Sequence, residues 1–214
     1  ATVNPIIYMG ASPIFLDVSD DLNISITDLE RFLKEETILK SSGTFNKRTN
    51  KKISAIILVH VFGSAVNIKP IIKICRKRKI KIIEDAAESL GTFYKKKYLN
   101  NKHTGTVGNF GCLSFNGNKI LTTGGGGAVL TKNEKDFNYC NYLCDQAKDD
   151  KILSIHNELG YNYKLSNIQS ALGCAQFEKL KSYLLKKKRV HRNYIKLFKN
   201  NKDFKILETK SYFK

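Results

Sequence analysis

The chain has 214 residues, of which 42% are hydrophobic and 26% charged, proportions typical of a protein that folds around a core. They exclude disordered, collagen and coiled-coil classes, and no apolar run approaches the roughly 20 residues of a membrane-spanning helix. The net charge is +18, from 37 basic and 19 acidic residues, and the lysines are spread along the chain. We interpret this charge as a solvated lysine-rich surface. Attraction to phosphorylated small molecules or to nucleic acid is the alternative.

The first third of the chain contains one strand signal and one helix signal. Residues 13–18 (PIFLDV) read as a short strand. Ser25 and Asp28 resemble a capping box that opens an amphipathic helix through Leu29 and Leu33. Residues 40–52 are polar, and we expect a loop there.

A strand–helix–strand pattern follows. Residues 53–60 form an almost continuous apolar run, as in a strand that is buried on both faces. Asn67 is placed to cap a helix whose apolar stripe reaches Cys75, and residues 81–84 (KIIE) form another buried strand. This spacing predicts a βαβ unit, and therefore an α/β fold with an at least partly parallel sheet.

The second half of the chain alternates glycine-rich turns with helices. Short strands are predicted at residues 111–115 and 128–130, within a stretch that holds most of the glycines. A helix is expected at 134–143, and a long helix from Ser166 to about residue 198.

The five cysteines have irregular spacing, and we expect no metal site. Cys140 and Cys144 lie four residues apart, but no second pair completes a zinc-binding set. Reduced, buried thiols in a cytoplasmic protein are the simplest account of them.

Three short segments carry residue types suited to chemistry. In the first, Asp85 directly follows a predicted strand, where an open parallel sheet binds its ligands; the alternative is a helix N-cap. In the second, Ser114 precedes Lys119 by five residues, and four glycines follow at 124–127. In a nucleotide-binding P-loop the lysine comes after the glycines, so this order differs; the alternative for Lys119 is an ordinary surface residue.

The third segment, GYNYKLS at residues 160–166, places aromatic, amide and cationic groups directly before the long helix. Its alternative interpretation is a helix entry capped by Ser166.

The order of these segments resembles the sugar-aminotransferase family of pyridoxal-phosphate enzymes, which has the aspartate-aminotransferase fold. EDAAES looks like the family's EDAAQ or EDAAH, and SFNGNK looks like its cofactor-lysine segment. GYNYKLSNIQSALGCAQFEKL looks like its GYNYR segment. The similarity is greatest to the branch that aminates C4 of a UDP-linked 4-keto-6-deoxy-N-acetylglucosamine, toward bacillosamine or legionaminic acid.

The resemblance implies a three-layer α/β/α fold with a mostly parallel sheet, truncated at both ends. It implies a cofactor-binding large domain at residues 1–165, a linking helix at 166–199 and the start of a small domain at 200–214. We accordingly expect this chain to be an internal fragment of a longer enzyme.

The resemblance also implies roles for five residues. Lys119 would bind pyridoxal 5'-phosphate covalently and then transfer protons. Asp85 would pair with the pyridine nitrogen, and Ser114 would bind the cofactor phosphate. Asn162 would reach the phosphate in the other subunit of a homodimer with shared active sites. Glu88 stands where glutamine or histidine is commoner, and would contact the cofactor hydroxyl or the incoming amine.

The expected activity is therefore transfer of an amino group, with glutamate the usual donor, to the 4-keto group of a nucleotide-linked sugar. Nucleic acid and membrane are not expected as partners. Two alternatives stay open. One is a sugar dehydratase of the same family, in which histidine replaces the lysine at Lys119. The other is a non-catalytic basic fragment that binds nucleic acid.

Overall fold

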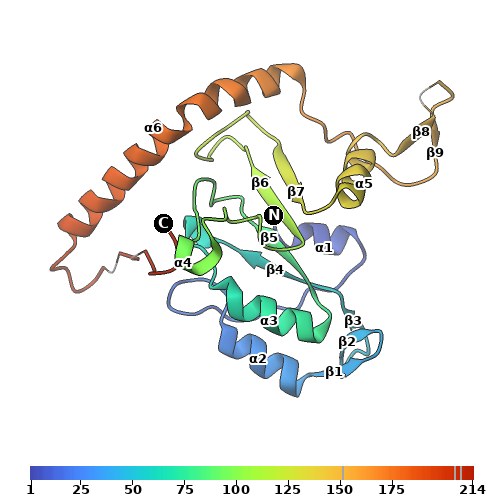
Figure 1. Ribbon diagram of the computed structural model, residues 1–214, viewed down its shortest axis with the longest axis horizontal. Coiled ribbons are helices and arrows are strands. Elements are labelled where there is room, and N and C mark those ends of the chain that lie inside the picture. Colours follow the sequence, from blue (N-terminus) through green and yellow to red (C-terminus); the bar gives the residue numbers. More distant parts are fainter. Residues whose placement is uncertain (151, 205, 208) are drawn as a thin grey trace. The chain divides into compact units, whose positions relative to one another are not determined.

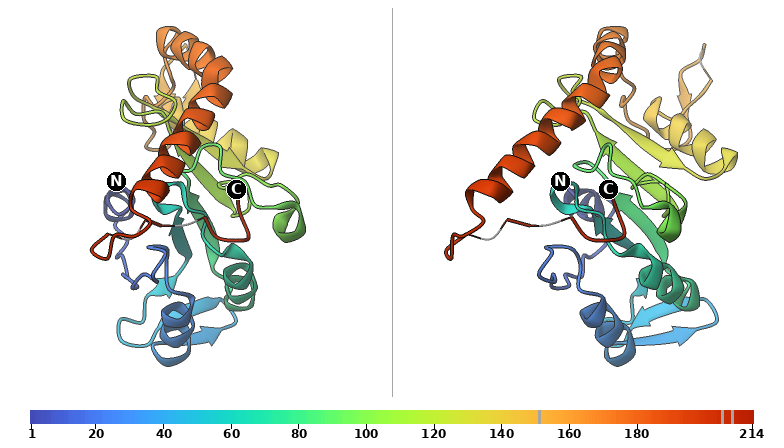
Figure 2. Two further views of the ribbon diagram at one scale, coloured as in Figure 1. Left: turned by 90° about the vertical axis from the view of Figure 1, so that its left-hand side faces the viewer. Right: turned by 60° about the vertical axis from the view of Figure 1, so that its left-hand side comes forward.

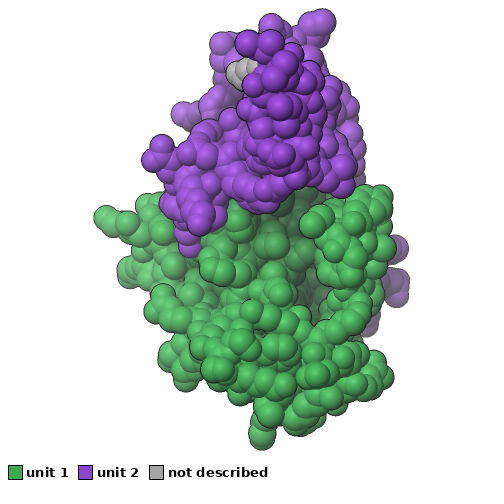
Figure 3. All heavy atoms as spheres, turned by 90° about the vertical axis from the view of Figure 1, so that its right-hand side faces the viewer, with its two compact units in different colours: residues 1–112, 211–214 green, residues 113–210 purple. Residues whose placement is uncertain are grey.

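The computed structural model describes residues 1–150, 152–204, 206, 207 and 209–214. The chain divides into two compact units, residues 1–112 with 211–214, and residues 113–210 (Figure 3). The domain division expected from the sequence, at residues 165 and 199, stays a prediction.

The first unit is built on a parallel βαβ arrangement. Strand β4 (Ala55–Val59) leads through helix α3 (Ile68–Arg78) to strand β5 (Lys81–Asp85), and β4 and β5 pair in parallel (Figure 1). Strand β6 (Phe110–Ser114) then pairs in parallel with β5. The sequence prediction of an α/β fold with a parallel sheet is confirmed.

Helix α2 (Ile26–Glu35) contacts α3, and the two helices lie side by side in Figures 1 and 2. As predicted, the Ser25 side chain caps α2 by accepting the backbone N–H of Asp28 at 3.2 Å. The core is formed by apolar side chains of α2, α3, β4 and β5, among them Leu29, Leu58 and Ile71. Burial of this apolar surface stabilises the unit.

Two predictions for the first unit are wrong. Residues 13–18 form no strand, and the backbone pairing that the structure gives them is one isolated bridge between Val18 and Ile24. Residues 40–52 are not a simple loop, because β1 (Thr37–Lys40), β2 (Gly43–Asn46) and β3 (Lys52–Ile53) make an antiparallel sheet. The polar β2 can be buried because Thr44 donates its hydroxyl to the carbonyl of Arg78 at 2.6 Å.

Short elements complete the first unit. Helix α1 (Asn4–Tyr8) lies near its N-terminus, a 3-10 turn η1 (Val61–Gly63) follows β4, and helix α4 (Lys96–Leu99) follows β5. The last residues of the chain also belong here, because Tyr94 and Phe213 pair as an antiparallel bridge.

The second unit begins inside β6 and continues with β7 (Gly127–Thr131), α5 (Glu134–Cys144), β8 (Lys148–Asp150), β9 (Ile155–His156) and α6 (Asn167–Leu197). Both helices confirm the sequence predictions. Ser166 and Gln169 form a capping box at the start of α6. The Ser166 side chain accepts the backbone N–H of Gln169, and the Gln169 side chain accepts the backbone N–H of Ser166.

The expectation of buried thiols is wrong for four of the five cysteines. Cys75 is buried and Cys174 is exposed, whereas Cys112, Cys140 and Cys144 are partly buried. Within the described residues, no helix is both long and apolar enough to cross a bilayer.

Candidate functional site

Asp85 lies at the carboxyl end of β5, between two parallel neighbours. It is in register with Val59 of β4 and with Cys112 of β6. Its carboxylate accepts the hydroxyl of Thr2 at 2.5 Å and the backbone N–H of Ala87 at 3.1 Å. The alternative interpretation as a helix N-cap is wrong, because residues 86–91 form turns rather than a helix.

Glu88 lies on the turn after Asp85 and contacts the loop that follows β4. Its Oε2 accepts the backbone N–H of Phe62 at 2.9 Å. A carboxylate that accepts an amide N–H makes a charge-assisted hydrogen bond, which is stronger than a neutral one. Glu88 therefore joins the ends of β4 and β5.

Next to Asp85, the carboxylate of Glu84 is fully buried and heavily hydrogen-bonded. His60 contacts its Oε2 at 3.0 Å, and the backbone N–H groups of Gly105, Val107 and Gly108 donate to its two oxygens at 2.6–3.0 Å. Burial alone would raise the pKa of Glu84, but the hydrogen bonds from His60 and from the glycine amides bring the pKa below its ordinary value.

The hydrogen bonds also assign the tautomer of His60. Its Nδ1 accepts the backbone N–H of Val66 at 3.1 Å, so the proton lies on Nε2 and points at Glu84. Sequence reasoning missed this pair. The sequence did contain a signal for this pair. A histidine ends one predicted buried strand and a glutamate ends the next, and a βαβ unit places two such strands side by side.

Ser114 and Lys119 bound a tight turn at the end of β6. The Ser114 hydroxyl accepts the backbone N–H of Asn116 at 3.3 Å, and the N–H of Lys119 donates to the carbonyl of Asn116 at 3.1 Å. Thr123 then returns to the strand by donating its backbone N–H to the carbonyl of Phe115 at 2.9 Å. Lys119 is partly buried in this turn.

Two of the glycines after Lys119 lie where a side chain would not fit. A Cβ at Gly126, whose φ is +97°, would lie 2.3 Å from Leu165. A Cβ at Gly127 would lie 2.3 Å from the carbonyl oxygen of Leu113 in β6. The segments 114–127 and 160–166 are brought together at Gly126, where there is no room for a side chain beside Leu165.

Asn162 lies in the exposed segment that precedes α6. It pairs with Asp145 as an antiparallel bridge, and the rings of its neighbours Tyr161 and Tyr163 stack with centroids 4.9 Å apart. Lys164 forms an ion pair with Asp145 at 2.8 Å. These contacts hold the segment at the end of α5 while the Asn162 side chain is exposed.

The expected site residues fall into two sets. Asp85 and Glu88 belong to the first unit, and Ser114, Lys119 and Asn162 belong to the second. Strand β6 connects the two sets along the chain. Its Cys112 pairs with Asp85 of β5, and its Ser114, two residues after Cys112, belongs to the second set. Among the described residues, no three His, Cys, Asp or Glu side chains cluster as metal ligands would.

Comparison with protein families identifies this combination of segments. The model of the DegT/DnrJ/EryC1/StrS aminotransferase family matches residues 1–212. The chain belongs to this family. The resemblance inferred from EDAAES, SFNGNK and the GYNYKLS segment is confirmed.

Three members of the family are similar to this chain over about half of their own length. EpsN of Bacillus subtilis (strain 168), named as a pyridoxal phosphate-dependent aminotransferase, is 40% identical over 91% of this chain and 46% of its own length. GDP-perosamine synthase of Escherichia coli O157:H7 is 34% identical over 89% and 47%. The UDP-4-amino-4,6-dideoxy-N-acetyl-beta-L-altrosamine transaminase of Campylobacter jejuni serotype O:2 is 33% identical over 100% and 53%.

Solved structures place the chain in the same fold. Helicobacter pylori PseC, an aminotransferase involved in the biosynthesis of pseudoaminic acid, matches with a TM-score of 0.78 and 26% identity. The match covers 94% of this chain and 49% of PseC. The chain spans about half the length of the curated relatives it matches.

Proposed function

We propose that the protein is a pyridoxal-phosphate-dependent aminotransferase that acts on a nucleotide-linked 4-keto-6-deoxy sugar, with glutamate as the amino donor. The observation that carries this proposal is the family match over residues 1–212, with Lys119 in the segment SFNGNK. The printed names of the relatives include both GDP-linked and UDP-linked sugars, and they support a nucleotide sugar in general. A UDP-linked N-acetylated sugar is our finer proposal.

The residues present fit pyridoxal phosphate. Asp85 offers a carboxylate at the carboxyl end of a parallel strand, which is where open sheets bind ligands. A Cβ at Gly124, five residues after Lys119 in the chain, would meet nothing within 4 Å, so the backbone at Gly124 is open to a ligand. When bound, pyridoxal phosphate supplies an electron sink that lets an amino group leave one carbon and join another.

The chain's own residues would divide the work. We propose that the Asp85 carboxylate holds a proton on the pyridine nitrogen, and that the Lys119 amine attaches the cofactor and then carries protons. Ser114 would bind the phosphate, whose charge favours hydroxyl and amide donors. Lys119 favours amino transfer over the dehydratase alternative, which requires histidine at this position.

We also propose a cytoplasmic homodimer in which Asn162 reaches the phosphate held by the other subunit. The exposure of Asn162 supports this proposal. Large apolar side chains of the same unit are exposed as well, including Leu159, Ile168 and Phe177.

The test is chemical labelling of Lys119 in the whole protein. Borohydride reduction in the presence of pyridoxal phosphate, followed by peptide mapping, should place the label on Lys119 and on no other lysine. Lys119→Ala should lose the label and lose amino transfer by several orders of magnitude. Lys135→Ala, which changes an exposed lysine of α5, is the control and should keep both. Label on another lysine would refute the assignment.

A further inference from the structure

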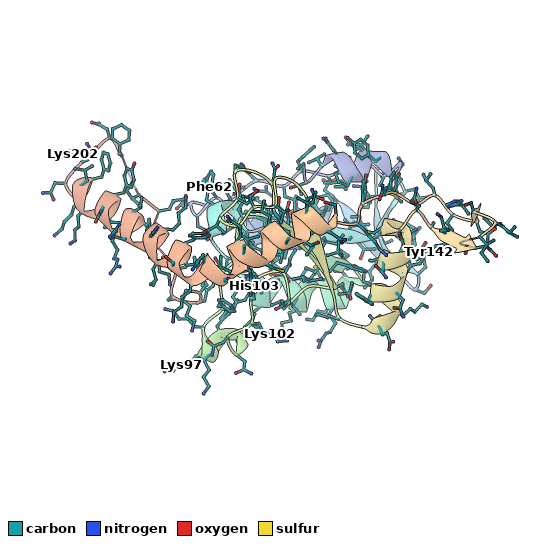
Figure 4. All side chains as sticks on the ribbon, turned by 90° about the horizontal axis from the view of Figure 1, so that it is seen from above. Phe62, Lys97, Lys102, His103, Tyr142 and Lys202 are labelled. Carbon is teal, nitrogen blue, oxygen red and sulfur yellow. The ribbon has the colours of Figure 1, made fainter. Side chains whose placement is uncertain are left out.

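Phe62 is an exposed aromatic residue in a backbone conformation that phenylalanine rarely adopts. Its φ is 52° and its ψ is 26°, in the left-handed region. Its side chain is 76% exposed (labelled in Figure 4), so burial of the ring does not compensate for the strain. Strained residues of this kind persist when the surroundings hold them, and they cluster at functional sites.

Contacts on both sides hold Phe62 in place. Glu88 Oε2 accepts its backbone N–H at 2.9 Å. The next residue, Gly63, also has a positive φ of 82°, and its carbonyl accepts the Thr92 hydroxyl at 2.8 Å. A Cβ at Gly63 would approach the carbonyl oxygen of Glu88 to 3.1 Å. The loop after β4 is thus fixed against the turn after β5.

This loop lies at the carboxyl end of the parallel strands, beside Asp85. The backbone N–H of His60, two residues before Phe62, donates to the carbonyl of Asp85 at 3.0 Å. The carboxylate that holds Phe62 is only three residues from Asp85 in the chain. The backbone of Phe62 therefore lies close to the strand end that carries Asp85, the group proposed to contact the cofactor.

We propose that Phe62 is a specificity-determining residue whose ring face binds the hexose of the substrate, and that Glu88 is the residue that positions it. This inference rests on the proposed function. The electron-rich face of an aromatic ring attracts the C–H groups of a sugar face, and a 6-deoxy sugar adds a methyl group. The reacting end of the substrate is the hexose, whereas the nucleotide lies at the far end of the diphosphate.

The two half-reactions of an aminotransferase separate this role from others. In the whole protein loaded with pyridoxal phosphate, Phe62→Ala should raise the KM for the nucleotide sugar about tenfold, as expected for one lost aromatic contact. Its Kd for the aminated nucleotide sugar, measured by calorimetry, should rise by a similar factor. The half-reaction with glutamate, followed by cofactor absorbance, should keep its rate because no sugar takes part.

Other variants exclude a loss of folding. Phe62→Asn removes the ring but suits a positive φ, so it should keep or raise the Tm while it reproduces the sugar defect. Phe62→Tyr keeps the ring and should retain sugar binding. Phe15→Ala is the matched control, because Phe15 is another phenylalanine of the first unit with 74% exposure; it should change none of these values.

Glu88 is tested by conservative rescue and by non-additivity. Glu88→Gln keeps an oxygen that can accept the Phe62 N–H, so its KM for the sugar should stay near the wild-type value. Glu88→Ala should raise this KM, and adding Phe62→Ala to it should change little, since both remove the same contact. Fully additive effects would overturn the positioning role.

Two results would overturn the role of Phe62. One is that Phe62→Ala and Phe62→Asn leave both the KM for the nucleotide sugar and the Kd for the aminated sugar unchanged. This is also the result expected if a second copy of the chain, rather than the substrate, covers the ring. The other is an equal loss in both half-reactions, which would place the ring at the cofactor. Failure of the proposed function differs from both, because the unaltered protein would then transfer no amino group from glutamate.

Discussion

At the scale of single residues, Glu84 shows how a buried charge can organise a site. Removing a carboxylate from water is costly, and His60 with three backbone amides offsets that cost. The same contacts fix the segment 105–108 and the first residue after β4. Asp85, the next residue in the chain, gains a defined position from this network because its own strand end is held on both sides.

The lowered pKa of Glu84 predicts an acid-sensitive fold. Its folded pKa lies below 4.5, the ordinary value that the unfolded chain regains. The stabilisation is therefore complete above about pH 4.5 and is lost as the pH falls through the folded pKa. Glu84→Gln should lower the free energy of unfolding at pH 7 by roughly 3 kcal/mol, the order of cost for breaking a buried pair.

Urea denaturation between pH 7 and pH 3 checks this prediction. The difference in unfolding free energy between wild type and Glu84→Gln should shrink below pH 4.5. Glu30→Gln, a change at an exposed glutamate of α2, should give a curve close to that of the wild type. A constant difference across the whole range would contradict the assignment of the acid sensitivity to Glu84.

At the scale of elements, close backbone approach decides where the glycine-rich segment runs. Gly127 is the first residue of β7 and lies directly against Leu113 of β6. Gly126 lies against Leu165, which precedes α6. Gly117, by contrast, has open space where its Cβ would be. The sequence shows all of these glycines alike, but only some of them are sterically required.

Gly127→Ala should therefore destabilise the second unit. The added Cβ would lie 2.3 Å from the Leu113 oxygen, a backbone atom that cannot move without disturbing β6. Overpacking of this kind costs about 1–3 kcal/mol, which should appear as a lower Tm in calorimetry. Gly117→Ala is the matched control and should leave the Tm nearly unchanged. Equal Tm values for the two variants would show that β6 can shift to accommodate the added Cβ at residue 127, and would contradict the prediction.

At the scale of the whole molecule, the proposed dimer adds Asn162 from the partner subunit to the proposed cofactor site. A site shared between subunits predicts a result on mixing altered subunits that a site within one subunit does not predict. Subunits with Asn162→Ala and subunits with Lys119→Ala, when mixed, should form heterodimers in which one site carries both changes and the other carries neither.

Activity should therefore return on mixing, relative to either altered homodimer. With random exchange about half of the dimers are mixed, so up to about one quarter of the wild-type activity is expected from their intact sites. Subunit exchange is verified by tagging one partner and recovering the other with it. No recovery despite exchange would place Asn162 in the site of its own subunit or outside any site.

The sequence by itself determined the elements whose signals are local. Apolar runs marked β4 and β5, helical periodicity with a capping serine marked α2 and α6, and short motifs marked the family and five candidate residues. These features could be read because periodicity, caps and motifs involve residues within one or two turns or strands of each other.

The tertiary structure decided whatever depends on partners far apart in the chain. Asn67 is positioned before α3, yet its side chain accepts the hydroxyl of Tyr98 instead of capping the helix. The polar strand β2 is buried because the carbonyl of Arg78 accepts a hydrogen bond from Thr44. Glu84 meets His60 and Glu88 meets Phe62 only when β4 and β5 lie side by side. Polar groups can be buried only where partners satisfy them, and the folded chain alone supplies those partners.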